Sequence, residues 1–191
     1  DHLVIAVGSR ADLSSLPGMA EHAFPFKTLG DAFFLRNHLI RLLEEAQVES
    51  DPKEKQDQLT FVIAGGGYTG VEVASEINSF TREAAESYSN IEPSDIKVIL
   101  LHRGTRILPV LSDKLAAFSH RVMQGRGVEV RLQTSITGAT AQGAILGNGD
   151  RISTRTLVVA VGSAPNQLLD SLPCNRDSRG RLEVDDTLSV P

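Results

Sequence analysis

Short apolar runs alternate along this chain with longer segments in which apolar residues recur every three or four positions. Apolar runs between turn residues are typical of buried strands, whereas the longer spacing is typical of helices with one buried face. The runs predict strands at residues 3–7, 59–64, 96–101, 128–132 and 156–161. The spacing predicts helices at residues 31–47 and 71–85, and a third helix that begins after Ser112 and ends near Gly125.

Between these segments lie stretches that are not expected to form regular elements. Residues 49–58 are highly charged and include Pro52, which predicts a solvated linker. After Leu132, short segments separated by glycines predict a small antiparallel β-meander. The tail from residue 164 onward is expected to be rich in loops. Strands that alternate with helices predict an α/β fold, here a Rossmann-like parallel sheet with a βαβαβ core.

One segment is nearly repeated. Residues 3–9 (LVIAVGS) resemble residues 157–163 (LVVAVGS). The two copies are 154 residues apart, from residue 3 to residue 157, which is far too long for a solenoid repeat. The similarity indicates two related dinucleotide domains, one of them truncated. The alternative is that apolar strands ending in Gly-Ser are simply common.

Composition narrows the class of protein. The 191 residues carry a formal net charge of −5 and show no basic stripe, which argues against a nucleic-acid partner. The single cysteine, Cys174, cannot form an internal disulfide, a CxxC pair or a cysteine-cluster zinc site. No apolar run approaches the roughly 20 residues that a membrane helix needs, and no signal peptide is recognisable. Because the sequence starts directly in a strand pattern without Met, we interpret it as a piece of a longer protein.

The glycine turn at residues 65–70 (GGGYTG) carries the clearest chemical signal. It follows a predicted strand and opens a predicted helix, which is the context that a dinucleotide-binding GxGxxG turn requires. Gly65 permits the tight turn, Gly67 lets the backbone approach a pyrophosphate, and Gly70 lets helix and strand pack closely. The pyrophosphate then lies at the positive end of the helix. The turn, which also contains Gly66, Tyr68 and Thr69, predicts a binding site for NAD(H) or NADP(H). Tyr68 either gates the nicotinamide pocket or is a packing residue.

The residues after the next strand bear on the choice of coenzyme. An acidic residue at this place accepts hydrogen bonds from the 2′-hydroxyl of NAD, and a basic residue favours the 2′-phosphate of NADP. The chain has His102 and Arg103 here, which favours NADP(H) with both residues near the phosphate. The alternative is that Arg103 and Arg106 are solvated loop charges. The spacing from Gly70 to His102 exceeds the usual ~20 residues, and an insertion at residues 86–95 would explain it.

Other candidate chemistry is sparse. Glu72 lies in the first turn of the helix, where a carboxylate stabilises the positive end. Because it would repel phosphates, it is expected to face away from them, either toward the nicotinamide or as a cap alone. The five histidines lack metal-ligand spacing, so no metal site is predicted. No catalytic side chain is assigned.

The sequence resembles the single-subunit, non-proton-pumping (type II) NADH dehydrogenases within the wider pyridine nucleotide–disulfide oxidoreductases. The resemblance covers nearly the whole chain. It is carried by residues 3–9, 17–18 (PG), 21–25 (EHAFP), 27–29 (KTL), 31–32 (DA), 35–38 (LRNH), 69–72 (TGVE), 90–93 (NIEP), 106–109 (RILP) and 127–130 (GVEV). Those dehydrogenases usually have Glu where this chain has His102. Residues 162–166 (GSAPN) look more like the broader disulfide-reductase and nitrite-reductase-like flavoproteins.

The resemblance implies a flavoprotein in which NAD(P)H passes hydride to FAD and the flavin reduces a quinone. It implies an NADH domain inserted into an FAD domain: residues 1–28 would flank from the FAD domain, 29–166 would form the NAD(P)H-binding domain, and 167–191 would return toward the FAD domain. FAD would bind only in the full-length protein, so the fragment alone is expected to be inactive. By the same resemblance, Glu72, Val161 and Gly162 would lie near the nicotinamide.

Alternatives and surroundings stay open at this point. The electron acceptor could be ferredoxin, sulfide or a thiol, and a non-enzymatic NAD(P)H-binding redox sensor is the candidate from another class. The expected location is cytoplasmic, with the full-length protein peripheral on the inner face of the membrane; the fragment itself is expected to make no membrane contact. Oligomeric state is open, but an unpaired strand at residues 3–7 would offer a second copy an edge, as in a homodimer.

The coenzyme assignment has a direct test in this chain. We expect His102→Glu to shift the preference toward NADH, because a carboxylate accepts from the 2′-hydroxyl and repels a 2′-phosphate. Calorimetric titration of NADH and NADPH measures the preference. An unchanged preference would contradict the placement of His102 and Arg103 at the phosphate.

Overall fold

The computed structural model describes residues 2–14 and 16–190. They fall into two compact units. Leu13–Val161 forms one continuous unit, and the described residues on either side of it form the other. The predicted boundaries at residues 28 and 166 remain a prediction.

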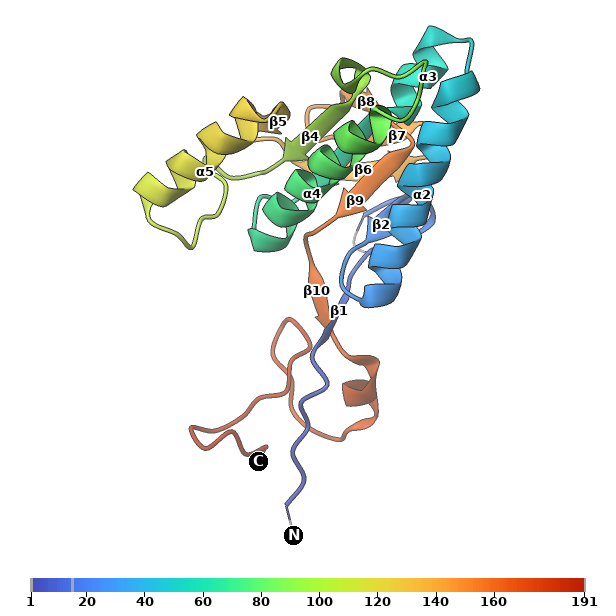
Figure 1. The fold of residues 1–191 in the computed structure, drawn as a ribbon. Helices are drawn as coiled ribbons and strands as arrows, with labels where there is room; N and C mark the ends of the chain where they lie inside the picture. Colours follow the sequence, from blue (N-terminus) through green and yellow to red (C-terminus); the bar gives the residue numbers. More distant parts are fainter. Residues whose placement is uncertain (1, 15, 191) are drawn as a thin grey trace. The chain divides into compact units, whose positions relative to one another are not determined.

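A five-stranded sheet is the centre of the Leu13–Val161 unit, and every strand pair in it is parallel (Figure 1). Its strands, in spatial order, are β2 (Phe24–Pro25), β9 (Thr156–Val159), β3 (Thr60–Ala64), β4 (Lys97–Leu101) and β5 (Val128–Arg131). The chain runs from β3 to β4 to β5 and then returns to β9 on the other side of β3. The strand order therefore reverses between β3 and β9, and ligands of such sheets bind at the carboxyl ends of the strands at this point.

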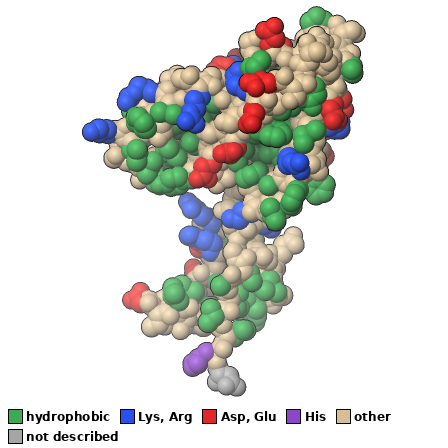
Figure 2. Space-filling view, viewed as in Figure 1, with side chains coloured by type: hydrophobic (Ala, Val, Ile, Leu, Met, Phe, Trp, Pro, Cys, Tyr) green, Lys and Arg blue, Asp and Glu red, His purple; other side chains and the backbone are tan. Residues whose placement is uncertain are grey.

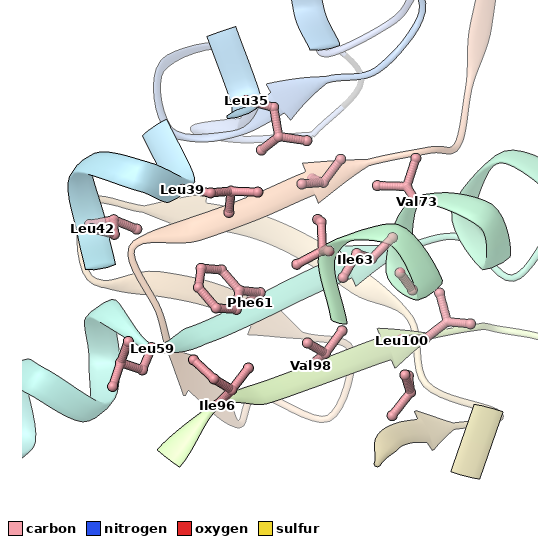
Figure 3. Close-up of a cluster of buried hydrophobic side chains, with 14 of the residues drawn as sticks. Leu35, Leu39, Leu42, Leu59, Phe61, Ile63, Val73, Ile96, Val98 and Leu100 are labelled. Carbon is pink, nitrogen blue, oxygen red and sulfur yellow. The ribbon is translucent and has the colours of Figure 1, made fainter. Parts of the chain in front are cut away.

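Helices cover one face of the sheet. They are α2 (Leu29–Val48), α4 (Tyr68–Ala85) and α5 (Asp113–Gly125). Alternate strand residues, such as Phe61, Ile63 and Leu100, pack against apolar side chains of α2 and α4 (Figure 3). This is the expected outcome of the helical spacing, because the residues that recur every three or four positions share one helix face.

The opposite face of the sheet is covered by a smaller layer. Val62, Ile99 and Val159 pack there against Met19 and the apolar side chains of a three-stranded antiparallel sheet. That sheet contains β6 (Ile136–Thr140), β7 (Gly143–Leu146) and β8 (Arg151–Ser153), and Met19 begins the short helix α1 (Met19–His22). Because both faces are covered, the central strands are continuous apolar runs. The α/β class, the parallel sheet and the predicted meander are confirmed.

The charged segment before β3 is a helix rather than the predicted linker. α3 (Pro52–Gln58) begins at Pro52 and is capped by Asp51, whose carboxylate accepts from the N–H of Lys53 at 2.8 Å. Proline at the first helical position loses no hydrogen bond, because that N–H has no partner in the helix. α5 begins directly after Ser112, as predicted, but the Ser112 side chain makes no capping hydrogen bond. The 86–95 segment ends in the 3-10 helix η1 (Pro93–Asp95).

The predicted strand at residues 3–7 is wrong. These residues form no strand, and Leu3 and Val4 are 86% and 85% exposed. The first strand is β1 (Ser9–Ala11), which pairs antiparallel with β10 (Ser163–Pro165). After β10 the described tail contains the 3-10 helix η2 (Gln167–Ser171), an isolated β-bridge between Arg176 and Leu182, and otherwise turns and loops. A homodimer through residues 3–7 remains a prediction.

His38 fastens α2 to the start of β9 and provides a test of the packing. Its Nε2 lies 3.1 Å from the carbonyl oxygen of Arg155 and 2.9 Å from Oγ1 of Thr156, and Arg41 donates to its Nδ1. Burial, and then the charge of Arg41, lowers the pKa of His38. The unfolded chain therefore takes up the proton first as pH falls below about 6.5, so stability present above that pH is lost below it.

We expect His38→Gln to reduce this acid sensitivity, because glutamine retains a donor but does not titrate. Urea unfolding of both proteins at pH 7.5 and 5.5 measures the difference. The wild-type free energy of unfolding should fall more between these pH values than that of the variant. Equal losses would show that His38 is not held neutral.

Candidate functional site

The glycine turn joins β3 to α4 at the point where the strand order reverses. Gly65 has φ +125°, which residues with a side chain rarely adopt. A Cβ there would lie 2.6 Å from Cγ1 of Val161 and 2.9 Å from the carbonyl oxygen of Ala160. The turn thus fits tightly against the end of β9, and it brings predicted residues 65 and 161 together.

Gly70 makes the closest approach in the turn. A Cβ at this position would lie 1.6 Å from the carbonyl oxygen of Gly65, which no structure tolerates without moving the helix. α4 therefore packs against its own preceding turn, as the third glycine of the motif predicts.

Gly67, unlike Gly65 and Gly70, is not closely packed. A Cβ at Gly67 would meet no atom within 4 Å, so the space beside it is open. Gly67 is also the N-cap of α4 and offers no side chain to accept from the N–H groups of the first turn. Such donors, together with the helix dipole, make the start of a helix suitable for an anion. Exposed Tyr68 and Thr69 occupy this first turn.

His102 follows β4 and reaches back to the turn. Its Nδ1 accepts a hydrogen bond from the N–H of Gly66 at 3.2 Å. A Cβ on Gly66 would lie 2.7 Å from Cγ of His102, and a Cβ on Gly104 would lie 2.7 Å from its Nε2. The half-buried imidazole therefore lies close against both glycines. Burial, and then the charge of Arg103, lowers the pKa of His102, against a hydrogen bond with the backbone of Arg106.

The two arginines of this loop differ in their surroundings. Arg106 donates to the carbonyl oxygen of Pro109 at 2.9 Å and forms an ion pair with Asp113 of α5, so it supports the loop. Arg103 is exposed, and no hydrogen bond or ion pair joins it to another described residue. The structure thus distinguishes Arg106, which is bonded to its surroundings, from Arg103, which is not. The sequence alone did not distinguish them.

Leu108 is a site residue that the sequence did not indicate. Its N–H donates to the carbonyl oxygen of Gly66 at 2.7 Å, and the residue is buried. Its φ is +49°, an unusual value for a bulky side chain. Leu108 belongs to the RILP motif, but a residue before proline is expected in extended backbone, and nothing local predicts a left-handed one.

Glu72, Val161 and Gly162 were predicted near the nicotinamide. Glu72 is exposed and lines a mainly apolar groove of about 380 Å³ between α2 and α4, together with Arg36 and Glu76. Hydrophobic side chains also reach the surface among charges of both signs on the face shown in Figure 2. Val161 contacts the turn at Gly65, whereas Gly162 begins the following segment of the other unit.

Comparison with known protein families identifies the family of this chain. The model of the family described as pyridine nucleotide-disulphide oxidoreductase matches residues 1–191. This chain belongs to the pyridine nucleotide-disulphide oxidoreductase family. In this family member, the glycine turn lies at the carboxyl end of the central strand, where the family's dinucleotide fold predicts it.

Two curated relatives of this pyridine nucleotide-disulphide oxidoreductase cover its entire length. A probable NADH dehydrogenase of Dictyostelium discoideum is 33% identical over 192 residues, and type II NADH:quinone oxidoreductase NdhA of Mycobacterium tuberculosis is 32% identical over 200 residues. The chain spans 43% of the length of each. Among the solved structures, NDH2 from Plasmodium falciparum in complex with NADH shares the fold, with a TM-score of 0.80 and 22% identity over 87% of this chain and 36% of that one.

Among the described residues, none of the helices combines the length and the apolarity needed to cross a bilayer.

Substitutions at two glycines of the turn are expected to have different effects on coenzyme binding and on protein stability. We expect Gly67→Ala to change the free energy of unfolding by less than about 1 kcal/mol, because its Cβ enters open space. The same methyl group should weaken NAD(P)H binding about tenfold or more, since it keeps the pyrophosphate from the backbone. Gly70→Ala should destabilise the protein by about 3 kcal/mol or more. Thermal melts and calorimetric titration measure both quantities.

Gly125→Ala is the matched control, because a Cβ there also meets nothing within 4 Å. It should leave coenzyme binding unchanged. Full NAD(P)H affinity in Gly67→Ala would show that the pyrophosphate does not lie at the turn.

Proposed function

We propose that this chain is the NAD(P)H-binding domain of an FAD-dependent dehydrogenase that passes hydride from NAD(P)H to FAD and then to a quinone. The observation that carries the proposal is the open, uncapped start of α4 beside Gly67, at the reversal point of a parallel sheet. Family membership supports a nucleotide-dependent oxidoreductase. The names of the curated relatives support NADH as donor and a quinone as acceptor.

The residues of the turn would hold the coenzyme. Backbone N–H groups around Gly67, Tyr68 and Thr69 would bind the pyrophosphate, with Gly65, Gly66 and Gly70 shaping the turn. The adenosine end of the coenzyme would extend toward the carboxyl end of β4, where His102 and Arg103 lie. Its nicotinamide end would extend the other way, toward β9 and Val161, with Glu72 and Gly162 as further neighbours.

The chemistry of electron transfer belongs to the cofactors. FAD, when bound in the full-length protein, supplies the acceptor for hydride and the donor to the quinone. The part of this chain is to hold the nicotinamide in one orientation and to shield it from water. Residues 1–28 and 167–191 are proposed to belong with the FAD-binding part, on either side of a nucleotide domain at residues 29–166. A quinone acceptor would place the full-length protein at the inner face of the membrane, bound peripherally.

Steady-state kinetics on the full-length protein test the proposal. NAD(P)H oxidation, followed by the loss of nicotinamide absorbance, is expected to depend on added soluble quinone and on bound FAD. The 191-residue chain alone should bind NAD(P)H but should neither retain FAD nor oxidise the coenzyme. Reduction of ferredoxin, sulfide or a thiol-type substrate in place of quinone would reassign the acceptor. No oxidation with any acceptor would leave an NAD(P)H-binding sensor and refute the enzyme assignment.

A further inference from the structure

The peptide bond between Gly66 and Gly67 lies in the middle of the glycine turn. We propose that Leu108 is a positioning residue of the coenzyme site: its backbone N–H holds this peptide in the orientation in which Gly67 can donate to the pyrophosphate of NAD(P)H. The inference rests on the proposed function, since it assumes that the pyrophosphate binds at the glycine turn.

The carbonyl group of this peptide is fixed by a contact from another loop. The carbonyl oxygen of Gly66 accepts a hydrogen bond from the N–H of Leu108 at 2.7 Å. In a trans peptide the C=O and N–H groups point in opposite directions, so the N–H of Gly67 points away from Leu108. No hydrogen bond joins that N–H to another described residue, and the space beside Gly67 is open. The donor is therefore available to a ligand at the start of α4.

Without the Leu108 contact, the peptide would have two orientations. Glycine reaches backbone conformations that other residues avoid, and this peptide has a glycine on each side, so little opposes its rotation. Rotation would turn the carbonyl oxygen of Gly66 toward the expected pyrophosphate, which it would repel, and would remove the Gly67 donor. The Leu108 contact favours the binding orientation. The N–H of Gly66 is held as well, since it donates to Nδ1 of His102 at 3.2 Å.

The backbone of Leu108 adopts a strained conformation to make this contact. Its φ of +49° is a left-handed value that is rare for a side chain of this size, and Leu108 also precedes Pro109, where extended backbone is preferred. Such outliers persist where the surrounding structure holds them, and they gather at functional sites. Two features hold this one. Ile107 and Leu108 are buried in the main core, and the N–H of Leu111 donates to the carbonyl oxygen of Leu108 at 2.9 Å.

Removal of the Leu108 N–H alone tests the proposal. Incorporation of the α-hydroxy analogue of leucine at position 108 replaces the amide by an ester, which keeps the side chain and deletes the donor. In calorimetric titrations of the 191-residue chain, NADH and NADPH should both bind about tenfold more weakly, because only a fraction of the molecules would then present the Gly67 donor. The two factors should be similar, since the pyrophosphate is common to both coenzymes.

The matched control is the same exchange at position 110, with the α-hydroxy analogue of valine. Val110 is exposed and lies in the same loop, and its N–H donates to no described residue. This ester should change neither affinity.

Two ordinary substitutions provide a second route. Valine is apolar, but its branched Cβ disfavours left-handed backbone, so Leu108→Val should lose the contact and weaken both coenzymes about tenfold. Asparagine adopts left-handed backbone readily, so Leu108→Asn should keep both affinities within about twofold of wild type. Leu108→Asn should nevertheless have the lower melting temperature, because it buries less apolar surface. Titrations are made below both melting temperatures.

Leu146→Val is the control for this pair, because Leu146 of β7 is similarly buried and is not among the residues with positive φ. It should leave both affinities unchanged.

The outcomes separate this inference from the proposed function. If the wild-type chain binds neither coenzyme, the proposed site is wrong and the inference falls with it. If it binds them and the ester at position 108 leaves both affinities unchanged, the site stands and the inference fails. Affinities that follow the melting temperatures of Leu108→Val and Leu108→Asn would also overturn the inference, because Leu108 would then act through packing.

Discussion

The approach of α4 to the carbonyl group of Gly65 is the constraint on which the rest of the site depends. Gly70 leaves no room for a side chain there, so the helix begins directly above the carboxyl end of the central strand. A Cβ on Gly65 would lie 2.6 Å from Val161 and 2.9 Å from Ala160, so the residues after β9 pack against the same turn. Helix, central strand and returning strand therefore converge within a few residues. The space beside Gly67, in contrast, stays open.

Features encoded locally could be predicted from the sequence. The apolar run before the glycines, the glycines themselves and the periodic helix after them are contiguous, so βαβ geometry and the place of the turn followed directly. The partner of His102 could not be predicted in this way. Gly66 lies 36 residues earlier, and only the pairing of β3 with β4 brings the two together. The left-handed Leu108 depends on the same long-range contact.

The two wrong predictions have physical causes. Residues 3–7 are apolar, but a strand also needs a neighbour for its backbone groups, and apolarity does not reveal whether one is present. Residues 49–58 were interpreted through their charge and Pro52, although Asp51 followed by proline is a strong signal for the start of a helix. Surface helices are charged on their exposed side, so polarity alone does not distinguish a short helix from a linker.

The imidazole between Gly66 and Gly104 also constrains how this sequence can change over evolutionary time. Neither glycine has a positive φ, and the atoms nearest to a Cβ at either position belong to His102. A Cβ at position 104 would meet only atoms of the imidazole ring, so a smaller residue at 102 would free this position. Position 66 would stay restricted, because the Cβ of residue 102 itself would lie 2.9 Å away. The order of substitutions therefore matters at position 104, where a larger residue is expected only in relatives with a shorter side chain at position 102.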